Sequence, residues 1–292
     1  MFSKLIQFFR CIRYTEVIIF QVPPFLGIAF TNTPLGDEWA SVLLFVLGNC
    51  CLFALIFAFN DWGDIDIDSR DVNKRESTFT KKGVSSQQML LASATLSGLV
   101  LMIFYGLGIT TFLLALVMLG LGFLYSHPRF AQKRIPIVAS LNHLAGGVTM
   151  FLLGYSLFRE IDLRGVAISL YFTLVFVAGH LCQEVRDYDQ DKLNGANTSA
   201  VRFGKRKIFS IAFALFIASF GYLWVLIESG IFPREWWYGI PLMLVIAAGF
   251  IRAWNGSLNF QQVSRFQTQY RLVFAIITGF MLIRLLFPSS SS

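Results

Sequence analysis

Charged residues are scarce in this chain of 292 residues, of which only 14% are Asp, Glu, Lys or Arg. Soluble domains usually carry about 25%. Hydrophobic residues make up 55% of the chain, and the mean hydropathy is +0.63. This composition excludes an ordinary soluble domain and indicates an integral membrane protein.

Cysteine and histidine are also scarce, with four and three residues. None of them has the CxxC or histidine spacing of a zinc site. The middle of each long apolar run lacks Asp and Glu, whereas transporters more typically carry ionisable groups near the bilayer midplane. These absences point away from a zinc protein and from a typical secondary transporter.

Apolar runs long enough to cross about 30 Å of hydrocarbon recur along the whole sequence. Backbone polar groups find no water in lipid, so such runs form helices. The sequence therefore predicts an all-α, polytopic membrane bundle of about nine helices in a single domain, residues 1–292. The expected spans are 15–31, 39–59, 87–106, 109–126, 137–158, 164–183, 207–228, 238–254 and 271–287.

The basic residues predict the orientation of the chain. Of the 24 Lys and Arg residues, 20 lie in the N-terminal segment or in loops on the same side as that segment. Short cytoplasmic loops retain Lys and Arg. We therefore expect the N-terminus on the cytoplasmic side, and we read residues 1–13 as a retained interfacial segment.

Ten of the 17 acidic residues lie in two stretches on this predicted cytoplasmic side. In the first stretch Asn60, Asp64 and Asp68 are spaced i, i+4, i+8, and Asp61 adds a further carboxylate. A helix stacks residues with this spacing on one face. In the second stretch Asp187 and Asp191 are one helical turn apart, so each stretch predicts a concentration of negative charge.

Divalent cations relieve the repulsion between such carboxylates. Both stretches imitate the start of an EF-hand loop, but its Gly and Glu positions are occupied by Ser69 and Arg75, and by Lys192 and Thr198. Mg²⁺ instead takes one or two carboxylates and shares its shell with waters and substrate phosphates. The clusters therefore favour Mg²⁺ over Ca²⁺.

Four predicted crossings separate the two clusters, which suggests two four-helix halves plus one further helix. We expect the two halves to enclose a central cavity that is open to the cytoplasmic side.

Asn60-Asp61-x-x-Asp64-x-x-x-Asp68 resembles the NDxxDxxxD motif of the UbiA superfamily of intramembrane prenyltransferases, and Asp187-x-x-x-Asp191 is similar to its second motif. The stretch that runs from Arg186 to Gly204 resembles the menaquinone-type branch. Tyr125-Ser126-x-Pro128 is similar to the family's YSxP segment.

The resemblance implies Mg²⁺-dependent transfer of a prenyl group from an isoprenyl diphosphate to an aromatic or other lipid-precursor acceptor within the membrane, as in lipoquinone biosynthesis. It implies Asp64, Asp68, Asp187 and Asp191 as catalytic residues, and Asn60 and Asp61 as further metal ligands. Lys74, Arg75, Tyr125, Lys133, Arg134 and Arg202 are the candidates for binding the diphosphate. Glu184 or Asp189 is a hypothetical base for the acceptor.

Two alternatives remain open. A terpene cyclase of the same superfamily keeps both clusters but needs no acceptor. A divalent-cation transporter uses the clusters as an ion-binding vestibule. The expected location is a bacterial inner membrane, with both motifs on the cytoplasmic side, and neither composition nor charge calls for a nucleic acid.

Overall fold

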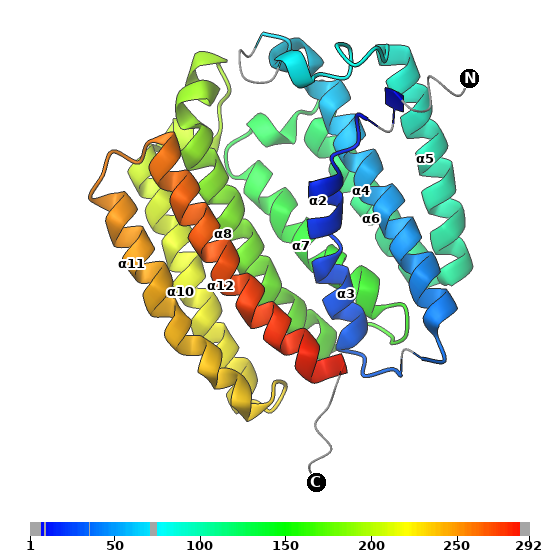
Figure 1. Cartoon of the computed structure of the whole chain (residues 1–292), viewed down its shortest axis with the longest axis vertical. Coiled ribbons are helices and arrows are strands. Elements are labelled where there is room, and N and C mark those ends of the chain that lie inside the picture. The colour runs from blue at the N-terminus through cyan, green and yellow to red at the C-terminus, as the bar shows by residue number, and fades with distance from the viewer. Residues whose placement is uncertain (1–6, 9, 35, 71–74, 287–292) are drawn as a thin grey trace. The chain divides into compact units, whose positions relative to one another are not determined.

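The computed structural model describes residues 7–8, 10–34, 36–70 and 75–286, and in that part of the chain all regular elements are helical (Figure 1). The α-helices are α2 (Tyr14–Ile19), α3 (Val22–Ala29), α4 (Trp39–Asp68), α5 (Ser86–Leu107), α6 (Ile109–Ser126), α7 (Val138–Tyr155), α8 (Leu163–Leu193), α9 (Ser199–Phe203), α10 (Lys205–Glu228), α11 (Met243–Trp254) and α12 (Phe260–Leu286). Three 3₁₀ segments are η1 (Arg75–Ser77), η2 (Gln132–Arg134) and η3 (Arg234–Leu242). The predicted all-α class is confirmed.

Among the described residues, seven helical segments are long and apolar enough to cross a membrane. Two of the nine expected spans are not among them. The first, 15–31, is divided into α2 and α3, where Pro23 and Pro24 fall in the first turn of α3. Proline is accepted in a first turn but has no backbone N–H, so Pro23 and Pro24 cannot donate to the carbonyl groups four residues earlier, which explains the division. The second, 137–158, becomes α7, which has 18 residues as α6 does but is not among the seven apolar segments.

Helices α4 and α8 are longer than a bilayer requires. They contain 30 and 31 residues, which corresponds to about 45 Å at 1.5 Å per residue. The hydrocarbon layer is about 30 Å thick. Each helix can therefore cross the membrane and continue beyond it by several turns, and the two acidic motifs lie on these extensions.

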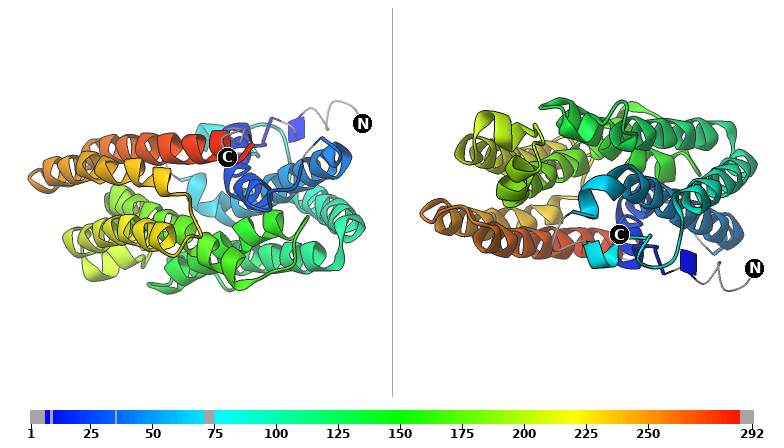
Figure 2. Two further views of the ribbon diagram at one scale, coloured as in Figure 1. Left: turned by 90° about the horizontal axis from the view of Figure 1, so that it is seen from below. Right: turned by 90° about the horizontal axis from the view of Figure 1, so that it is seen from above.

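The chain divides into two compact units. Unit 1 contains Met1–Ile28, Thr33–Gln132 and Leu153–Glu160, and unit 2 contains Ala29–Asn32, Lys133–Leu152 and Ile161–Ser292. In unit 1, α4 packs against α5, α6 and the N-terminal helix α2. In unit 2, α8 packs against α10 and α12, and Figure 2 shows α11 and α12 side by side. Each unit carries one of the acidic motifs on its longest helix.

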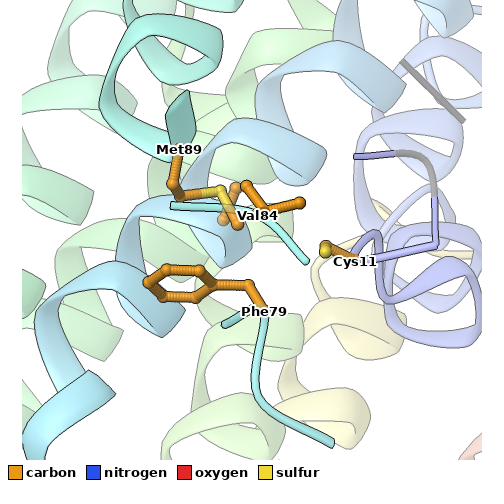
Figure 3. Close-up of a cluster of buried hydrophobic side chains, with 5 residues drawn as sticks. Cys11, Phe79, Val84 and Met89 are labelled. Carbon is orange, nitrogen blue, oxygen red and sulfur yellow. The ribbon is translucent and has the colours of Figure 1, made fainter. Parts of the chain in front are cut away.

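A small apolar cluster in unit 1 anchors the loop that follows α4. Phe79, Val84 and Met89 pack with Cys11 and with Ala58 of α4 (Figure 3). Phe79 is 2% exposed and Met89 is fully buried. The cluster also buries the Cys11 thiol, and burial raises its pKa. This packing fixes both the loop and the N-terminal segment against the end of α4 that bears the first motif.

Gly154, near the end of α7, allows a very close approach between two backbones of unit 1. A Cβ atom at this position would lie 1.8 Å from the carbonyl oxygen of Pro24. Because that contact is with backbone, a side-chain rotation cannot relieve it.

We therefore expect Gly154→Ala to destabilise the protein by about 1–3 kcal/mol, the usual cost of overpacking. Thermal unfolding in detergent measures the loss. Gly120→Ala is the matched control, because Gly120 of α6 has no atom within 4 Å of the added Cβ. Equal thermal stability of the two variants would contradict the close approach.

Candidate active site

The first acidic motif lies on the last turns of α4, so Asn60, Asp64 and Asp68 share one helical face as the spacing predicted. The C-terminal end of α6 supports this face. Ser126 Oγ donates a hydrogen bond of 3.1 Å to Asn60 Oδ1, and Ser126 is buried. Gly63 permits the approach, because a Cβ there would lie 2.3 Å from the carbonyl oxygen of Ser126.

Arg13 of the N-terminal segment binds the first motif. Its guanidinium forms an ion pair with both carboxylate oxygens of Asp61. Burial lowers the pKa of Arg13, but the neighbouring carboxylates, Asp61 foremost, together raise that pKa above its ordinary value. The same guanidinium lies 5.9 Å from the ring centroid of Phe57. No sequence pattern predicts this contact, which joins residues 48 positions apart.

A cavity of about 510 Å³ opens beside this ion pair within unit 1. Asp61 and Asp68 of the motif line it together with two cations, Arg13 and Lys82. Lys82 Nζ also donates to the carbonyl oxygen of Arg10 at 3.1 Å. A cavity bounded by both carboxylates and cations suits a ligand that brings an anion and a divalent metal ion together.

The second motif lies on the last turns of α8. Arg186 donates two hydrogen bonds of 2.7 Å to the two carboxylate oxygens of Asp187. Arg186 also donates to Gln267 of α12 at 3.2 Å, and Gln267 is buried. Asp191 accepts a hydrogen bond of 3.3 Å from Thr198 Oγ1. The second motif is thus held by its own helix, by α12 and by the segment that precedes α9.

The predicted diphosphate ligands are divided between the units. In unit 1, Arg75 of η1 forms an ion pair of 3.4 Å with Glu76, and both side chains are largely exposed. Tyr125 is the penultimate residue of α6. Lys133 and Arg134 end η2, and Arg202 lies in α9 of unit 2. Lys74 lies outside the described residues. Arg13 and Lys82 are two further cations beside the first motif, and the sequence motifs did not indicate them.

The chemistry of the donor set fits Mg²⁺. The motif residues offer carboxylate and amide oxygens, which are the ligands of a hard cation. Among the described residues, no group of three or more His, Cys, Asp or Glu side chains gathers as a closed metal site. A magnesium ion that shares its shell with substrate phosphates needs only one or two carboxylates from a given helix.

The long apolar helices, two of which end in carboxylate motifs, define a polytopic membrane protein of all-α class. A family model described as the UbiA prenyltransferase family matches residues 21–282. The chain therefore belongs to the UbiA prenyltransferase family.

The individual proteins that the chain resembles share only about a fifth of its residues. The chain is 22% identical over 200 residues to a 4-hydroxybenzoate octaprenyltransferase of Polynucleobacter asymbioticus, and the match covers 68% of each protein. A UbiA homologue from Archaeoglobus fulgidus, solved with GPP and Mg²⁺, has a TM-score of 0.70 and 20% identity, and covers 95% of this chain and 99% of its own. A structure described as digeranylgeranylglyceryl phosphate synthase in membranes has a TM-score of 0.76 and 17% identity, with 97% and 99% coverage. These structures confirm the fold.

The contact between Gly63 and Ser126 generates a prediction for activity. Gly63→Ala forces α4 away from the end of α6 and breaks the hydrogen bond to Asn60. We expect prenyl transfer to fall by about 10- to 100-fold, because small misplacements of binding groups have effects of that size. Gly98→Ala on α5, where nothing lies within 4 Å of the added Cβ, is the control and retains activity. Retention of full activity by Gly63→Ala would show that this approach does not position the motif.

Proposed function

We propose that the protein transfers a prenyl group from an isoprenyl diphosphate to an aromatic or other lipid-precursor acceptor, with Mg²⁺ as cofactor. The observation that carries the proposal is the pair of carboxylate motifs on the extended ends of α4 and α8 in a member of a prenyltransferase family. The relatives support it, since one is named a 4-hydroxybenzoate octaprenyltransferase and homologues were solved with GPP or DMAPP and Mg²⁺.

The reaction breaks the bond between the allylic carbon and the diphosphate oxygen, and the diphosphate leaves with the electron pair. The allylic carbon then bonds to the acceptor, which loses a proton. Bound Mg²⁺ neutralises the diphosphate and stabilises the charge that develops on it. Asp64, Asp68, Asp187 and Asp191 are the proposed carboxylate ligands, with Asn60 and Asp61 as further ligands.

The cations of the chain have a separate task, which is to bind the diphosphate oxygens. Arg13 and Lys82 line the cavity beside the first motif, and Lys133, Arg134 and Arg202 belong to the unit of the second motif. Lys74 and Arg75 complete the proposed cations, and Tyr125 is proposed as a neutral hydrogen-bond donor to the same oxygens. Guanidinium and ammonium groups form charge-assisted hydrogen bonds to phosphate oxygens, so they hold the leaving group while its charge grows.

Aromatic rings beside the first motif suit the hydrocarbon part of the substrate. Phe20, Phe53 and Phe57 contact one another, with ring centroids 5.0 to 6.3 Å apart. Phe57 already lies beside a cation, the guanidinium of Arg13. An aromatic face attracts positive charge and excludes water, so these rings can stabilise an allylic cation.

The distribution of basic residues supports a reaction at the cytoplasmic side of the membrane. From the positive-inside rule we propose that the N-terminal segment and both motifs are cytoplasmic. We propose the bacterial inner membrane as the location. A water-soluble aromatic acceptor reaches such a site from the cytoplasm, whereas the prenyl chain stays in the hydrocarbon.

Activity measurements with Asp64→Asn test the proposal. Purified protein is incubated in detergent with Mg²⁺, radiolabelled geranylgeranyl diphosphate or shorter and longer donors, and a panel of aromatic and glycerol-phosphate acceptors. We expect Mg²⁺-dependent product that EDTA abolishes and that Asp64→Asn reduces by about 100-fold or more. Asp66→Asn is the matched control, since Asp66 lies on the same helix, is exposed and is outside the motif.

Other outcomes identify the alternatives. A cyclic hydrocarbon formed from the donor alone would show a terpene cyclase. No consumption of any donor, together with cation uptake by sealed vesicles, would show a transporter. Either result contradicts prenyl transfer.

The two adjacent lysines Lys81 and Lys82 test the proposed diphosphate ligands. Lys82 lines the cavity beside Asp61, whereas Lys81 is exposed. We expect Lys82→Gln to raise KM for the isoprenyl diphosphate about tenfold, because a hydrogen bond from a charged donor is lost. Lys81→Gln should change KM by less than about twofold, as exposed charges usually do. Equal effects of the two substitutions on KM would contradict a specific role for Lys82.

A further inference from the structure

Glu184 is a buried acidic residue on the helix that carries the second motif. It lies three residues before Asp187 on α8 and is 6% exposed. Burial of an acidic side chain is expensive unless hydrogen bonds compensate for the lost water. The partners of Glu184 therefore indicate what the residue does.

Both carboxylate oxygens of Glu184 contact the segment at the start of α9. The backbone N–H of Ala200 donates to Oε2 at 3.0 Å, and Ser199 Oγ donates to Oε1 at 3.5 Å. His180 Nε2 lies 3.3 Å from Oε1, and its ring stacks on His143 of α7 with a centroid distance of 3.7 Å. The carboxylate thus joins α8 to the start of α9, and the stacked imidazoles join α8 to α7.

Ser199 extends this network to the segment that precedes α7. Ser199 Oγ accepts a hydrogen bond of 3.1 Å from the backbone N–H of Ile137. Ile137 has φ of +68°, a left-handed conformation that a β-branched residue rarely adopts. A conformation of this cost persists only where its surroundings hold it. The bond to Ser199 therefore helps to fix the chain three residues after Arg134.

Thr198 connects the same segment to the second motif, since it donates to Asp191 at 3.3 Å. Residues 198–200 are thereby held at two points of α8, at Glu184 and at Asp191. Arg202 follows two residues after Ala200 in α9. The network fixes the segments that carry Arg202, Lys133 and Arg134 relative to the second motif.

We infer that Glu184 is a positioning residue for the diphosphate-binding cations of unit 2 and is not the base that deprotonates the acceptor. The inference rests on the proposed function. A general base needs an oxygen that can reach the proton of the acceptor, whereas both oxygens of Glu184 already accept hydrogen bonds from residues 199 and 200.

Two substitutions of Glu184 separate the roles. Glu184→Leu keeps the approximate volume but accepts no hydrogen bond. Glu184→Gln keeps an oxygen that accepts from the Ala200 N–H, but an amide is not a base at neutral pH. A positioning role predicts that Gln restores what Leu loses, whereas a base predicts that both variants lose the same activity.

The first measurement is thermal stabilisation by Mg²⁺ and geranylgeranyl diphosphate without acceptor, which reports binding independently of turnover. We expect Glu184→Leu to raise the half-saturating diphosphate concentration by about tenfold or more. Glu184→Gln should stay within about threefold of the wild type, because its acceptor to Ala200 remains. Steady-state kinetics should show the same pattern in KM for the donor, with kcat of Glu184→Gln largely retained.

Ser169→Ala is the control for a buried polar change on α8. Ser169 is fully buried and donates only to Val166 of its own helix, at 2.7 Å, so its loss should not alter diphosphate binding. If Glu184→Leu does not fold, Ser199→Ala tests the same network, because it removes the link between the carboxylate and Ile137. It should weaken diphosphate binding several-fold.

Each contrary result has its own meaning. Wild-type protein that is not stabilised by any isoprenyl diphosphate with Mg²⁺ would overturn the proposed function and the inference together. Normal diphosphate binding by folded Glu184→Leu, or by Ser199→Ala where Glu184→Leu does not fold, would overturn the inference alone. Loss of kcat in Glu184→Gln with unchanged donor KM would identify Glu184 as a base.

Discussion

Carboxylates cannot remain in hydrocarbon without partners, and this constraint determines where the motifs of this protein lie. Asp and Glu at the centre of a membrane helix cost several kcal/mol. The sequence meets the constraint by extending α4 and α8 beyond the length that a bilayer requires and by confining the motif carboxylates to the extensions. Because each extension continues the same rigid helix, the spacing between motif residues is preserved. The motif carboxylates therefore lie on helix ends that are anchored by the packing of the apolar parts of α4 and α8.

Concentrated negative charge creates a second requirement, since like charges on adjacent turns repel. In each unit an arginine meets one motif carboxylate. Arg13 reaches Asp61 from the N-terminal segment, whereas Arg186 binds Asp187 from the same helix. These ion pairs lower the repulsion in the absence of metal, and they keep guanidinium groups beside the carboxylates that are proposed to meet a diphosphate. The two motifs reach similar electrostatics by different routes.

The sequence predicted the features that depend on local periodicity. Helical spacing alone places Asn60, Asp64 and Asp68 on one face, and apolar length gives most of the helices. The contacts of Arg13 and Lys82 were not predictable in this way, because they join the N-terminal segment to residues 48 and 72 positions away. Nothing in the sequence separates Lys82 from its neighbour Lys81, since the difference arises only when Phe79 and Val84 pack beneath the loop. Pro23 and Pro24 indicate the break between α2 and α3, whereas apolar length alone predicts one span over residues 15–31.

The two motifs depend to different degrees on distant parts of the chain, because different residues hold them in place. The second motif has its arginine in its own helix, and Glu184 and Thr198 hold the following segment close by. Its geometry is therefore largely decided by residues 184–200. The first motif receives Arg13 from before α2 and Ser126 from the end of α6, so it forms only after three distant segments have packed. Gly63 supports the same conclusion, because its missing side chain is needed for contact with α6 and not for the helix of α4 itself. The second motif thus depends mainly on α8 and its continuation, with α12 as a further support through Gln267, and the first is a product of the tertiary fold of unit 1.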